Sequence, residues 1–431
     1  MMKRRRTKAV LLILAVALTV GLIGCNTASD SSSTDNNGVV TLTLMTHYSQ
    51  QQEKELKKYI DQWNKEHPNI QVKHKSVADF SKLLPTIMAQ QTSGQQADIL
   101  HIYSLWGGQL AKSNVLAQPP ADVKSDIEAN YPSASIKGAT VDGKLLGYPT
   151  EVQTYALYYN KKLLKDAGFT NPPSTWDELY QVAKAVTKRK NGKIVVEGFG
   201  LKSSTVTAGV VHPYLSLLYT AGGRLINEDG TKAELDSEAG LKTLEFQKKL
   251  IKEKLSDLSI DVAKGFPSER VAMTINASWW QGTLKAVMKD NFENIGVAPI
   301  PSPDGKSKGS VSYSFFYGVN SKSKHQEEAW EFLKWLNSQK QENGATAEGN
   351  FLLSQGIIPA RTSDIEAFEK ELSTLNNKPF IDALEYAVPE PNLLQGEKIM
   401  TLLQKQIEAV WTDQTRPEQA LKTATEQINR E

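Results

Sequence analysis

Cysteine is almost absent from this chain, which has a single one, Cys25, among its 431 residues. One cysteine excludes an internal disulfide framework and a zinc site built from several thiolates. Beyond residue 23, no apolar run approaches the ~20 residues that a transmembrane helix needs. An excess of basic charge is also missing, because 50 Lys and Arg stand against 48 Asp and Glu. The sequence therefore shows no basic footprint for nucleic acid.

The single cysteine directly follows an amino-terminal leader. Five cations lie in the first eight residues, residues 9–23 are apolar, and Gly24-Cys25 comes next. A charged head, a short apolar centre and a small-residue cut site are typical of a secretory signal. A cysteine at this position resembles the lipobox of bacterial lipoproteins, whose thiol is lipidated; an ordinary signal peptide with an incidental cysteine is the alternative. We expect residues 1–24 to be a lipoprotein signal peptide and Cys25 to carry the lipid, such as palmitate.

The remaining chain is predicted to be a soluble body tethered outside the cytoplasm at the bacterial cell membrane. Losing the leader removes five cations and no acid, so the net charge falls from +2 to −3. Residues 25–38 are rich in Ser, Asn and Asp and predict a flexible tether. A chain of this length exceeds one ordinary hydrophobic core, so two lobes are expected.

Strands and helices alternate in the first part of the body. Apolar residues alternate over 40–44, and Ser49 and Gln52 form a capping box for the next helix. A strand at 70–72, a helix at 80–91 and a strand at 97–103 follow, which predicts a parallel sheet covered by helices. Ligands gather at the carboxyl ends of such strands. This places five residues at a candidate site: His47, Tyr48, Tyr103, Ser104 and Trp106.

A second alternation of elements follows a turn near Pro149. The expected helices are 161–167, 176–189, 212–221, 237–253 and 326–336, and the chain from 380 onward is largely helical. The expected strands lie near 198–201, 271–275 and 295–298, followed by a Pro-, Gly- and Ser-rich loop at 299–312.

Five short segments, in this order, resemble one known family. They are Ala156-Leu157-Tyr158-Tyr159-Asn160, Pro173-Ser174-Thr175-Trp176-Asp177-Glu178-Leu179, Val271-Ala272-Met273-Thr274-Ile275 with Trp279, Gly296-Val297-Ala298-Pro299-Ile300-Pro301, and Ala329-Trp330-Glu331-Phe332-Leu333. Together they are similar to the extracellular solute-binding proteins of ABC importers, in the sugar-binding group. Thr150 and Glu151, just before the first segment, are polar where the family usually has smaller or apolar residues.

The resemblance implies an α/β, two-lobed periplasmic-binding-protein-like (type II) fold. Each lobe would be a mainly parallel sheet flanked by helices, with the ligand cleft between the lobes. The expected N-terminal lobe comprises 39–150 and 313–368, and the C-terminal lobe 151–312 and 369–431. The implied function is the capture of a carbohydrate, most simply an oligosaccharide, by a monomer that delivers it to membrane permease subunits. No cofactor and no metal are expected.

Sugar sites need flat aromatic surfaces for C–H faces and fixed polar groups for hydroxyls. The resemblance carries a sugar-stacking role to Trp279, and its neighbour Trp280 is a second candidate. The resemblance also implies ligand contacts for the segment that follows Pro149 and crosses between the lobes, and for the His-Pro-Tyr segment at residues 212–214. The chain crosses back between the lobes near residues 313–316, which contain an aromatic cluster. Alternate side chains of a strand face opposite ways, so one or two of these aromatic residues should line the cleft. These additional candidates are Glu151, Gln153, His212, Tyr214, Tyr313, Phe315 and Phe316.

Two other function classes compete with a sugar receptor. A lipid-anchored glycosidase would need two carboxylates flanking the scissile bond. The sequence has no HExxH motif, no GxSxG elbow and no phosphate-cradling glycine loop, so no catalytic residue is assigned. The same fold could instead bind a polyamine, a phosphate ester or a metal. Arg361 is the one arginine near a suspected cleft loop, and a structural ion pair is its expected role.

Overall fold

A computed structural model describes residues 33–34, 38–227, 230–374 and 376–431. The predicted signal peptide, the predicted lipidation site Cys25 and most of the predicted tether lie outside these residues. The strands are β1 (Ser33–Thr34), β2 (Val40–Thr46), β3 (Ile70–Ser76), β4 (Ile99–Tyr103), β5 (Thr140–Val141), β6 (Lys144–Leu145), β7 (Tyr148–Asn160), β8 (Lys188–Lys190), β9 (Lys193–Val196), β10 (Met273–Ala277), β11 (Ile295–Ala298), β12 (Val311–Val319) and β13 (Val388–Pro389).

The helices are α1 (Gln50–Glu66), α2 (Phe80–Ser93), α3 (Gly107–Lys112), α4 (Ala121–Asn130), α5 (Ser133–Gly138), α6 (Lys161–Asp166), α7 (Trp176–Val186), α8 (Thr207–Thr220), α9 (Glu238–Lys252), α10 (Val262–Gly265), α11 (Trp280–Met288), α12 (Gln326–Ser338), α13 (Ala347–Ser354), α14 (Thr362–Ala367), α15 (Glu369–Leu372), α16 (Lys378–Ala383), α17 (Gly396–Trp411) and α18 (Pro417–Ile428), with 3-10 turns η1 (Ser104–Trp106) and η2 (Lys289–Asn294). No helix of the described residues is both long and apolar enough to cross a membrane.

Local sequence signals explain where several helices begin and end. The predicted capping box at Ser49 and Gln52 is present at the start of α1. Thr175 and Glu178 form a second capping box at the start of α7. Gly94 ends α2 in the left-handed conformation, φ 74°, which favours glycine over residues with a side chain.

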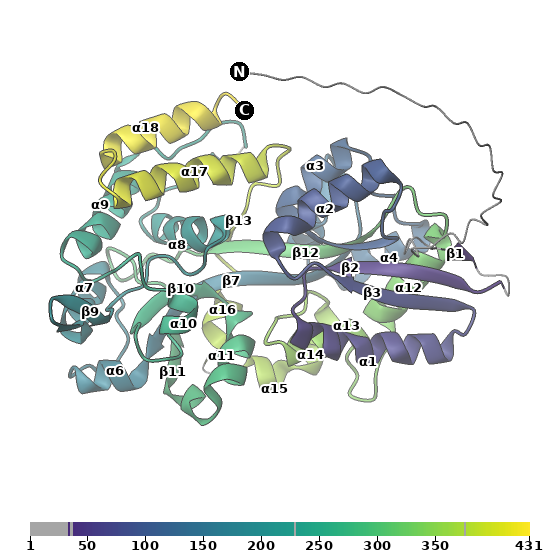
Figure 1. Ribbon diagram of the computed structural model, residues 1–431, viewed down its shortest axis with the longest axis horizontal. Helices are drawn as coiled ribbons and strands as arrows, with labels where there is room; N and C mark the ends of the chain where they lie inside the picture. Colours follow the sequence, from purple (N-terminus) through teal and green to yellow (C-terminus); the bar gives the residue numbers. More distant parts are fainter. Residues whose placement is uncertain (1–32, 35–37, 228–229, 375) are drawn as a thin grey trace, which may run out of the picture. The chain divides into compact units, whose positions relative to one another are not determined.

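The main sheet runs β3-β2-β4-β12-β7 and then continues to β10 and β11, which both pair with β7. Strand β2 is parallel to β3 and β4, as expected from the first strand–helix alternation. Strand β12 is antiparallel to both β4 and β7. Residues 148–154 of β7 pair with β12, whereas residues 155–160 pair with β10 and β11. One long strand therefore joins two halves of the sheet (Figure 1).

Helices cover both halves of this sheet (Figure 1). Helix α1 packs on β3, and α12 packs on α13 and β12. In the other half, α17 packs on α8, α9 and α18. The half around β10 and β11 contains its own apolar cluster, in which Tyr158, Phe266, Trp280 and Phe380 meet. The larger cluster extends from β2 and β4 to α8 and α17.

Three details differ from the sequence-based expectations. The sheet is mainly parallel only around β2, since β10 and β11 run antiparallel to β7. The helix expected over 176–189 ends at Val186, because the Asn191-Gly192 turn, with both φ angles positive, folds the next residues into the β8–β9 hairpin. Residues 198–201 form no strand, and their pairing is reduced to an isolated bridge from Gly200 to Thr274.

Candidate functional site

A cavity of about 590 Å³ opens where β4 ends. Tyr103 closes β4 and Trp106 closes the η1 turn that follows, so both rings face the cavity from one side. His212 of α8 and Glu390, which follows β13, lie on the opposite side. The other lining residues are Asp79, Phe80, Ser81, Leu84, Pro85, Leu105, Thr205, Val206, Thr207, Ala208, Glu397, Met400 and Gln404.

A chain of hydrogen bonds crosses between the two sides of this cavity. The Tyr155 hydroxyl lies 2.7 Å from His212 Nδ1, and His212 Nε2 lies 2.5 Å from Glu390 Oε1. The Tyr103 hydroxyl donates to the same carboxylate. Burial, followed by the charge of Glu390, raises the pKa of both Tyr103 and Tyr155 well above the ordinary value. Both phenols therefore remain protonated and can donate hydrogen bonds at neutral pH.

The Trp106 ring is fixed from two directions. Its indole Nε1 donates to Glu397 Oε2 at 3.0 Å. Its face stacks on Phe80, with ring centroids 4.9 Å apart and an interplanar angle of 25°. Offset stacking and an indole hydrogen bond together hold a flat aromatic surface in one orientation. Such a surface suits the apolar C–H face of a ligand.

A second cavity, of about 680 Å³, adjoins the first at Glu390, which lines both. The predicted residues Ser104 and Tyr313 line it. Its other walls are Pro132, Ser133, Ala134, Ser135, Lys137, Gly138, Val152, Ser312, Ser314, Ile358, Pro359, Ala360, Ile365, Leu384, Ala387, Pro389 and Asn392. Glu390 thus connects two hollows that together offer room for more than one sugar ring.

Trp279 and Trp280 lie in different environments although they are adjacent. Trp279 is 36% exposed and comes just before α11. Its backbone N–H donates to Gln153 Oε1 at 3.1 Å, and the Ser278 hydroxyl donates to the same oxygen. Tyr313 lines the second cavity; burial raises the pKa of its hydroxyl, and the nearby Trp279 side chain lowers it. Gln153, a predicted contact residue, is buried and lines neither cavity.

Four predicted contact residues lie in the core and line neither of these cavities: Tyr48, Tyr214, Trp280 and Phe316. Trp280 is 2% exposed and packs edge-on to Tyr158. The Tyr48 hydroxyl lies 3.4 Å from both His101 Nε2 and Tyr317. Helix periodicity explains the placement of Trp280, because it follows the partly exposed Trp279 and turns its side chain the other way.

Three further predicted residues, His47, Glu151 and Phe315, form a layer beneath the first cavity instead of its wall. The His47 ring stacks on Phe315 at 4.8 Å and on His101 at 5.3 Å. Glu151 is buried, with its carboxylate 3.7 Å from His101 Nε2. These residues support the β4–β12 region that carries Tyr103.

Sequence reasoning missed Glu390, Glu397 and Phe80. Glu390 stands between two prolines in Val388-Pro389-Glu390-Pro391, in a stretch expected to be largely helical. A carboxylate bracketed by prolines marks a break between helices, and that signal could have singled it out. Glu397 begins α17, and nothing in its local pattern separates it from surface glutamates. Phe80 occupies an ordinary apolar helical position.

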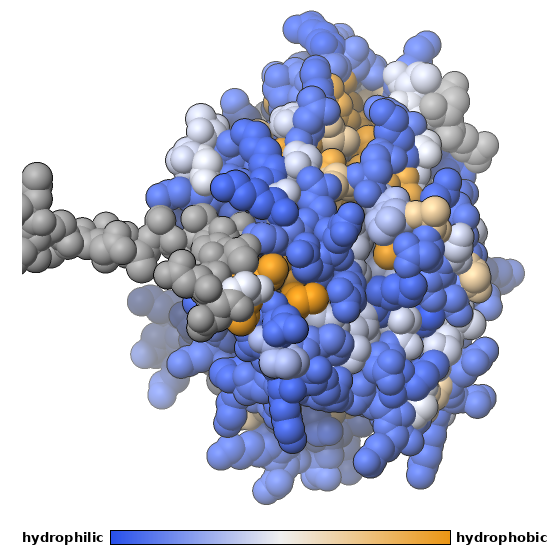
Figure 2. Space-filling view, turned by 90° about the vertical axis from the view of Figure 1, so that its right-hand side faces the viewer, coloured by the Kyte–Doolittle hydropathy of each residue, from blue (hydrophilic) through white to orange (hydrophobic). Residues whose placement is uncertain are grey.

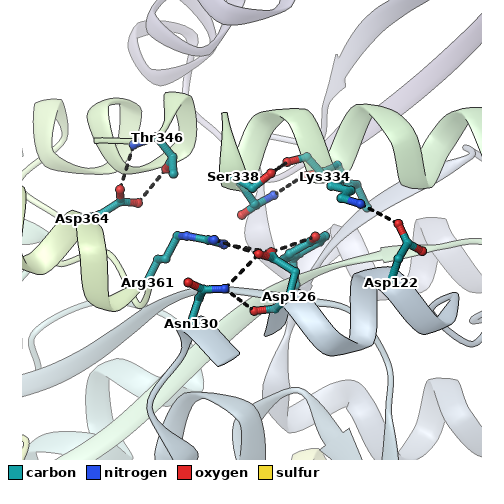
Figure 3. A network of polar contacts seen from close by, with 11 residues as sticks. Asp122, Asp126, Asn130, Lys334, Ser338, Thr346, Arg361 and Asp364 are labelled. Carbon is teal, nitrogen blue, oxygen red and sulfur yellow. Dashed lines mark hydrogen bonds and ion pairs between the residues drawn. The ribbon is translucent and has the colours of Figure 1, made fainter. Parts of the chain in front are cut away.

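Arg361 forms the structural ion pair expected for it. Its Nη1 and Nη2 donate to the two Asp126 carboxylate oxygens at 2.9 and 2.8 Å, which joins the start of α14 to α4 (Figure 3). Both side chains are largely buried. No group of three or more His, Cys, Asp or Glu within the described part of the chain is arranged to hold a metal ion.

Comparisons with known proteins agree with this architecture. The model of the family described as bacterial extracellular solute-binding protein matches residues 48–343. The maltodextrin-binding protein MdxE of Bacillus subtilis is 25% identical over 415 residues, covering 91% of this chain and 90% of that protein. The sn-glycerol-3-phosphate-binding periplasmic protein UgpB of Pectobacterium atrosepticum is 24% identical, covering 87% of each. The GacH receptor of Streptomyces glaucescens, solved unliganded and in complex with acarbose, has a TM-score of 0.79 at 25% identity, covering 90% of this chain and 97% of that one.

Proposed function

Because the chain belongs to the bacterial extracellular solute-binding proteins and has their two-lobed type II fold, we propose that it is the carbohydrate receptor of an ABC importer. It captures an oligosaccharide between its lobes and delivers it to the membrane permease. The proteins of this family are binding proteins and not enzymes. The proposed role is therefore capture and release without chemical change of the ligand.

The observation that carries this proposal is the make-up of the first cavity. Tyr103 and Trp106 offer aromatic surface on one side, and His212 and Glu390 offer polar groups on the other. Aromatic surface suits the weakly apolar faces of sugar rings, and a carboxylate forms strong charge-assisted bonds with sugar hydroxyls. Tyr313 extends this combination to the second cavity, and the partly exposed Trp279 lies beside Tyr313. We propose that these six residues contact the ligand.

Lobe closure follows from where these residues are anchored. We propose the N-terminal lobe as residues 39–150 with 313–368 and the C-terminal lobe as 151–312 with 369–431. Strand β7 pairs with β12 up to Thr154 and with β10 from Tyr155 onward, which supports a crossing between the lobes close to the proposed boundary at residues 150 and 151. A ligand that touches both lobes binds the closed state more tightly than the open one and so shifts the population toward closure.

Membrane attachment is proposed to occur through a lipid on Cys25. Tethering raises the local concentration of the receptor near the permease without any additional contact. A monomer suits this role, and in the view of Figure 2 the hydrophobic residues reach the surface only in small groups. Replacement of Cys25 by Ala should release the protein from the membrane fraction while leaving its carbohydrate affinity unchanged.

A phosphate ester is the second candidate ligand, favoured by the similarity to the glycerol-3-phosphate-binding relative. The first cavity speaks against it, since three carboxylates and no lysine or arginine belong to its described lining. An anionic ligand would meet repulsion there.

A thermal-shift screen over oligosaccharides, monosaccharides and glycerol 3-phosphate tests the proposal. A ligand that binds only the folded state raises the melting temperature in a concentration-dependent way. We expect stabilisation by one or more oligosaccharides and unchanged sugar after prolonged incubation. Hydrolysis of the sugar, or stabilisation by glycerol 3-phosphate alone, would contradict it.

A further inference from the structure

The first cavity is negatively charged as well as aromatic. Glu390 comes from the segment between β13 and α17, and Glu397 from the first turn of α17. The Glu390 side chain is 2% exposed and bonds to Tyr103 and His212. Glu397 accepts a hydrogen bond from Trp106. The third carboxylate, Asp79 at the exposed rim, caps α2 and pairs with Lys82.

No lysine or arginine of the described lining pairs with these two glutamates, and His212 is the one basic side chain beside them. The lining of the cavity contains no lysine and no arginine, and its one histidine, His212, is bonded to Glu390. Burial raises the pKa of the Glu397 carboxyl and the hydrogen bond from Trp106 lowers it; the charge of Glu390 raises it further, and His212 partly offsets that effect. Two carboxylates held together in a partly buried cavity repel each other, and a cation between them removes that repulsion.

Three aromatic rings complete the arrangement. Phe80, Tyr103 and Trp106 contact one another, with ring centroids 4.9 to 5.6 Å apart. The faces of such rings attract cations, most strongly that of tryptophan. An aromatic cluster beside paired carboxylates is the chemistry that recognises an organic ammonium group. It contrasts with a metal site, for which no grouping of ligands exists within the described residues.

We infer that this cavity selects a saccharide carrying a protonated amino group, such as an oligosaccharide of glucosamine, and binds the ammonium between Glu390 and Glu397 beside the aromatic rings. The inference rests on the proposed carbohydrate function and narrows it to amino sugars. The ammonium donates charge-assisted hydrogen bonds to the carboxylates. The remaining sugar hydroxyls and ring faces meet His212 and Trp106. An N-acetylated amino sugar lacks the charge and loses this contribution.

Calorimetric titration of the protein with three tetrasaccharides of the same linkage tests the inference. The probes are a β-1,4-linked glucosamine tetrasaccharide, its N-acetylated form and cellotetraose, at a pH where the free amine is protonated. We expect the glucosamine form to bind at least ~10-fold more tightly than the other two, because a charge-assisted pair contributes more than a neutral bond. Putrescine, an amine without a sugar, should bind far more weakly.

Variants of the two glutamates locate the effect. Glu397→Gln should reduce affinity for the glucosamine tetrasaccharide more than for cellotetraose, so that the ratio between them falls several-fold. Glu390→Gln should act in the same direction, which guards against a folding defect in either variant. Glu408→Gln is the matched control, because Glu408 lies on the same helix, pairs with Lys202 and does not line this cavity. In this control, the ratio of the affinity for the glucosamine tetrasaccharide to that for cellotetraose should equal the ratio in the unaltered protein.

The outcomes separate this inference from the proposed function. Equal or weaker binding of the glucosamine form, with clear binding of cellotetraose, overturns the amino-sugar inference and leaves a carbohydrate receptor. Binding of putrescine at least as tight as that of the tetrasaccharide overturns the carbohydrate function itself. Binding of none of the probes overturns the inference, and the thermal-shift screen then decides the wider proposal.

Discussion

His212 Nε2 lies 2.5 Å from Glu390 Oε1, although the two residues are 178 positions apart in the sequence. His212 belongs to a helix packed on α17, and Glu390 belongs to the segment that leads into α17. Tyr103, from the end of β4, donates to the same carboxylate. One carboxylate therefore contacts elements from both halves of the sheet, and this contact defines the position of the candidate site.

The adjacent tryptophans should respond differently to truncation. Trp279→Ala should weaken carbohydrate binding by at least ~1 kcal/mol and leave stability nearly unchanged, because the ring is partly exposed and contacts Tyr313. Trp280→Ala should cost about 3–5 kcal/mol of unfolding free energy, because it opens a cavity in the core. Calorimetric affinity and urea unfolding measure the two effects. Unchanged affinity in the Trp279 variant would mean that the ring is not part of the site.

Acid should destabilise the protein through His47. Burial and the neighbouring His101 hold the pKa of His47 well below its ordinary value of 6.5. The unfolded chain therefore binds a proton that the folded chain does not, and stability falls as the pH drops below 6.5. His47→Gln should show a smaller loss between about pH 7 and about pH 5. Urea midpoints at both pH values test this, and parallel curves for the two proteins would refute it.

Glu197 should produce the opposite pH dependence. Burial raises the pKa of its carboxyl to about 8, and only one of its oxygens accepts hydrogen bonds, from Ser256 and Asp257. A raised carboxyl pKa means that the folded state retains a proton, so this group lowers stability as the pH rises from 4.5 to about 8. Its contribution is at most about 1.4 kcal/mol per pH unit.

Glu197→Gln tests that contribution without touching either cavity. The variant should gain stability relative to the unaltered protein as the pH rises from about 5 to about 8. Its carbohydrate affinity should be unchanged, since Glu197 lies near β9 and lines neither cavity. A stability difference that does not change with pH would contradict the raised pKa.

The buried pair of Arg361 and Asp126 should be important for stability. Arg361→Ala leaves the Asp126 carboxylate without its bidentate partner and should cost about 3–5 kcal/mol. Arg361→Lys should recover only part of this loss, because an ammonium cannot reproduce the two parallel bonds. Thermal unfolding of the two variants provides the measurement. Equal melting temperatures for both variants and the unaltered protein would show that the pair contributes nothing.

The sequence predicted elements whose signals are local. The capping box at Ser49 and the position of Tyr103 and Trp106 at a strand end follow from patterns within a few residues. The parallel pairing around β2 follows from the regular alternation of strands and helices in the first part of the body. The direction of β12 was not predictable in this way. Its antiparallel pairing with β4 depends on contacts between residues about 200 positions apart.

The site was predictable in part for the same reason. Strand ends and family-like segments indicated Tyr103, Trp106, His212 and Tyr313, and all four line a cavity. Trp280 and Phe316 are aromatic residues of the kind that sugar sites use, but their side chains point into the core. Predicting that orientation requires the register of the strand or helix to be known. Glu390 reaches the site only because the last helices pack against the rest of the fold. The prolines on either side of it mark a break between helices, but they do not indicate that long-range contact.

The assignment of the first cavity as the ligand site is tested most directly by two calorimetric titrations with the same oligosaccharide, one on the unaltered protein and one on Trp106→Ala. We expect one saturable site in the unaltered protein and at least ~10-fold weaker binding in the variant, because the ring fixed by Phe80 and Glu397 forms one wall of the cavity. Circular dichroism should show both proteins folded. Equal affinity in the two titrations, with both proteins folded, would contradict the assignment of this cavity as the ligand site.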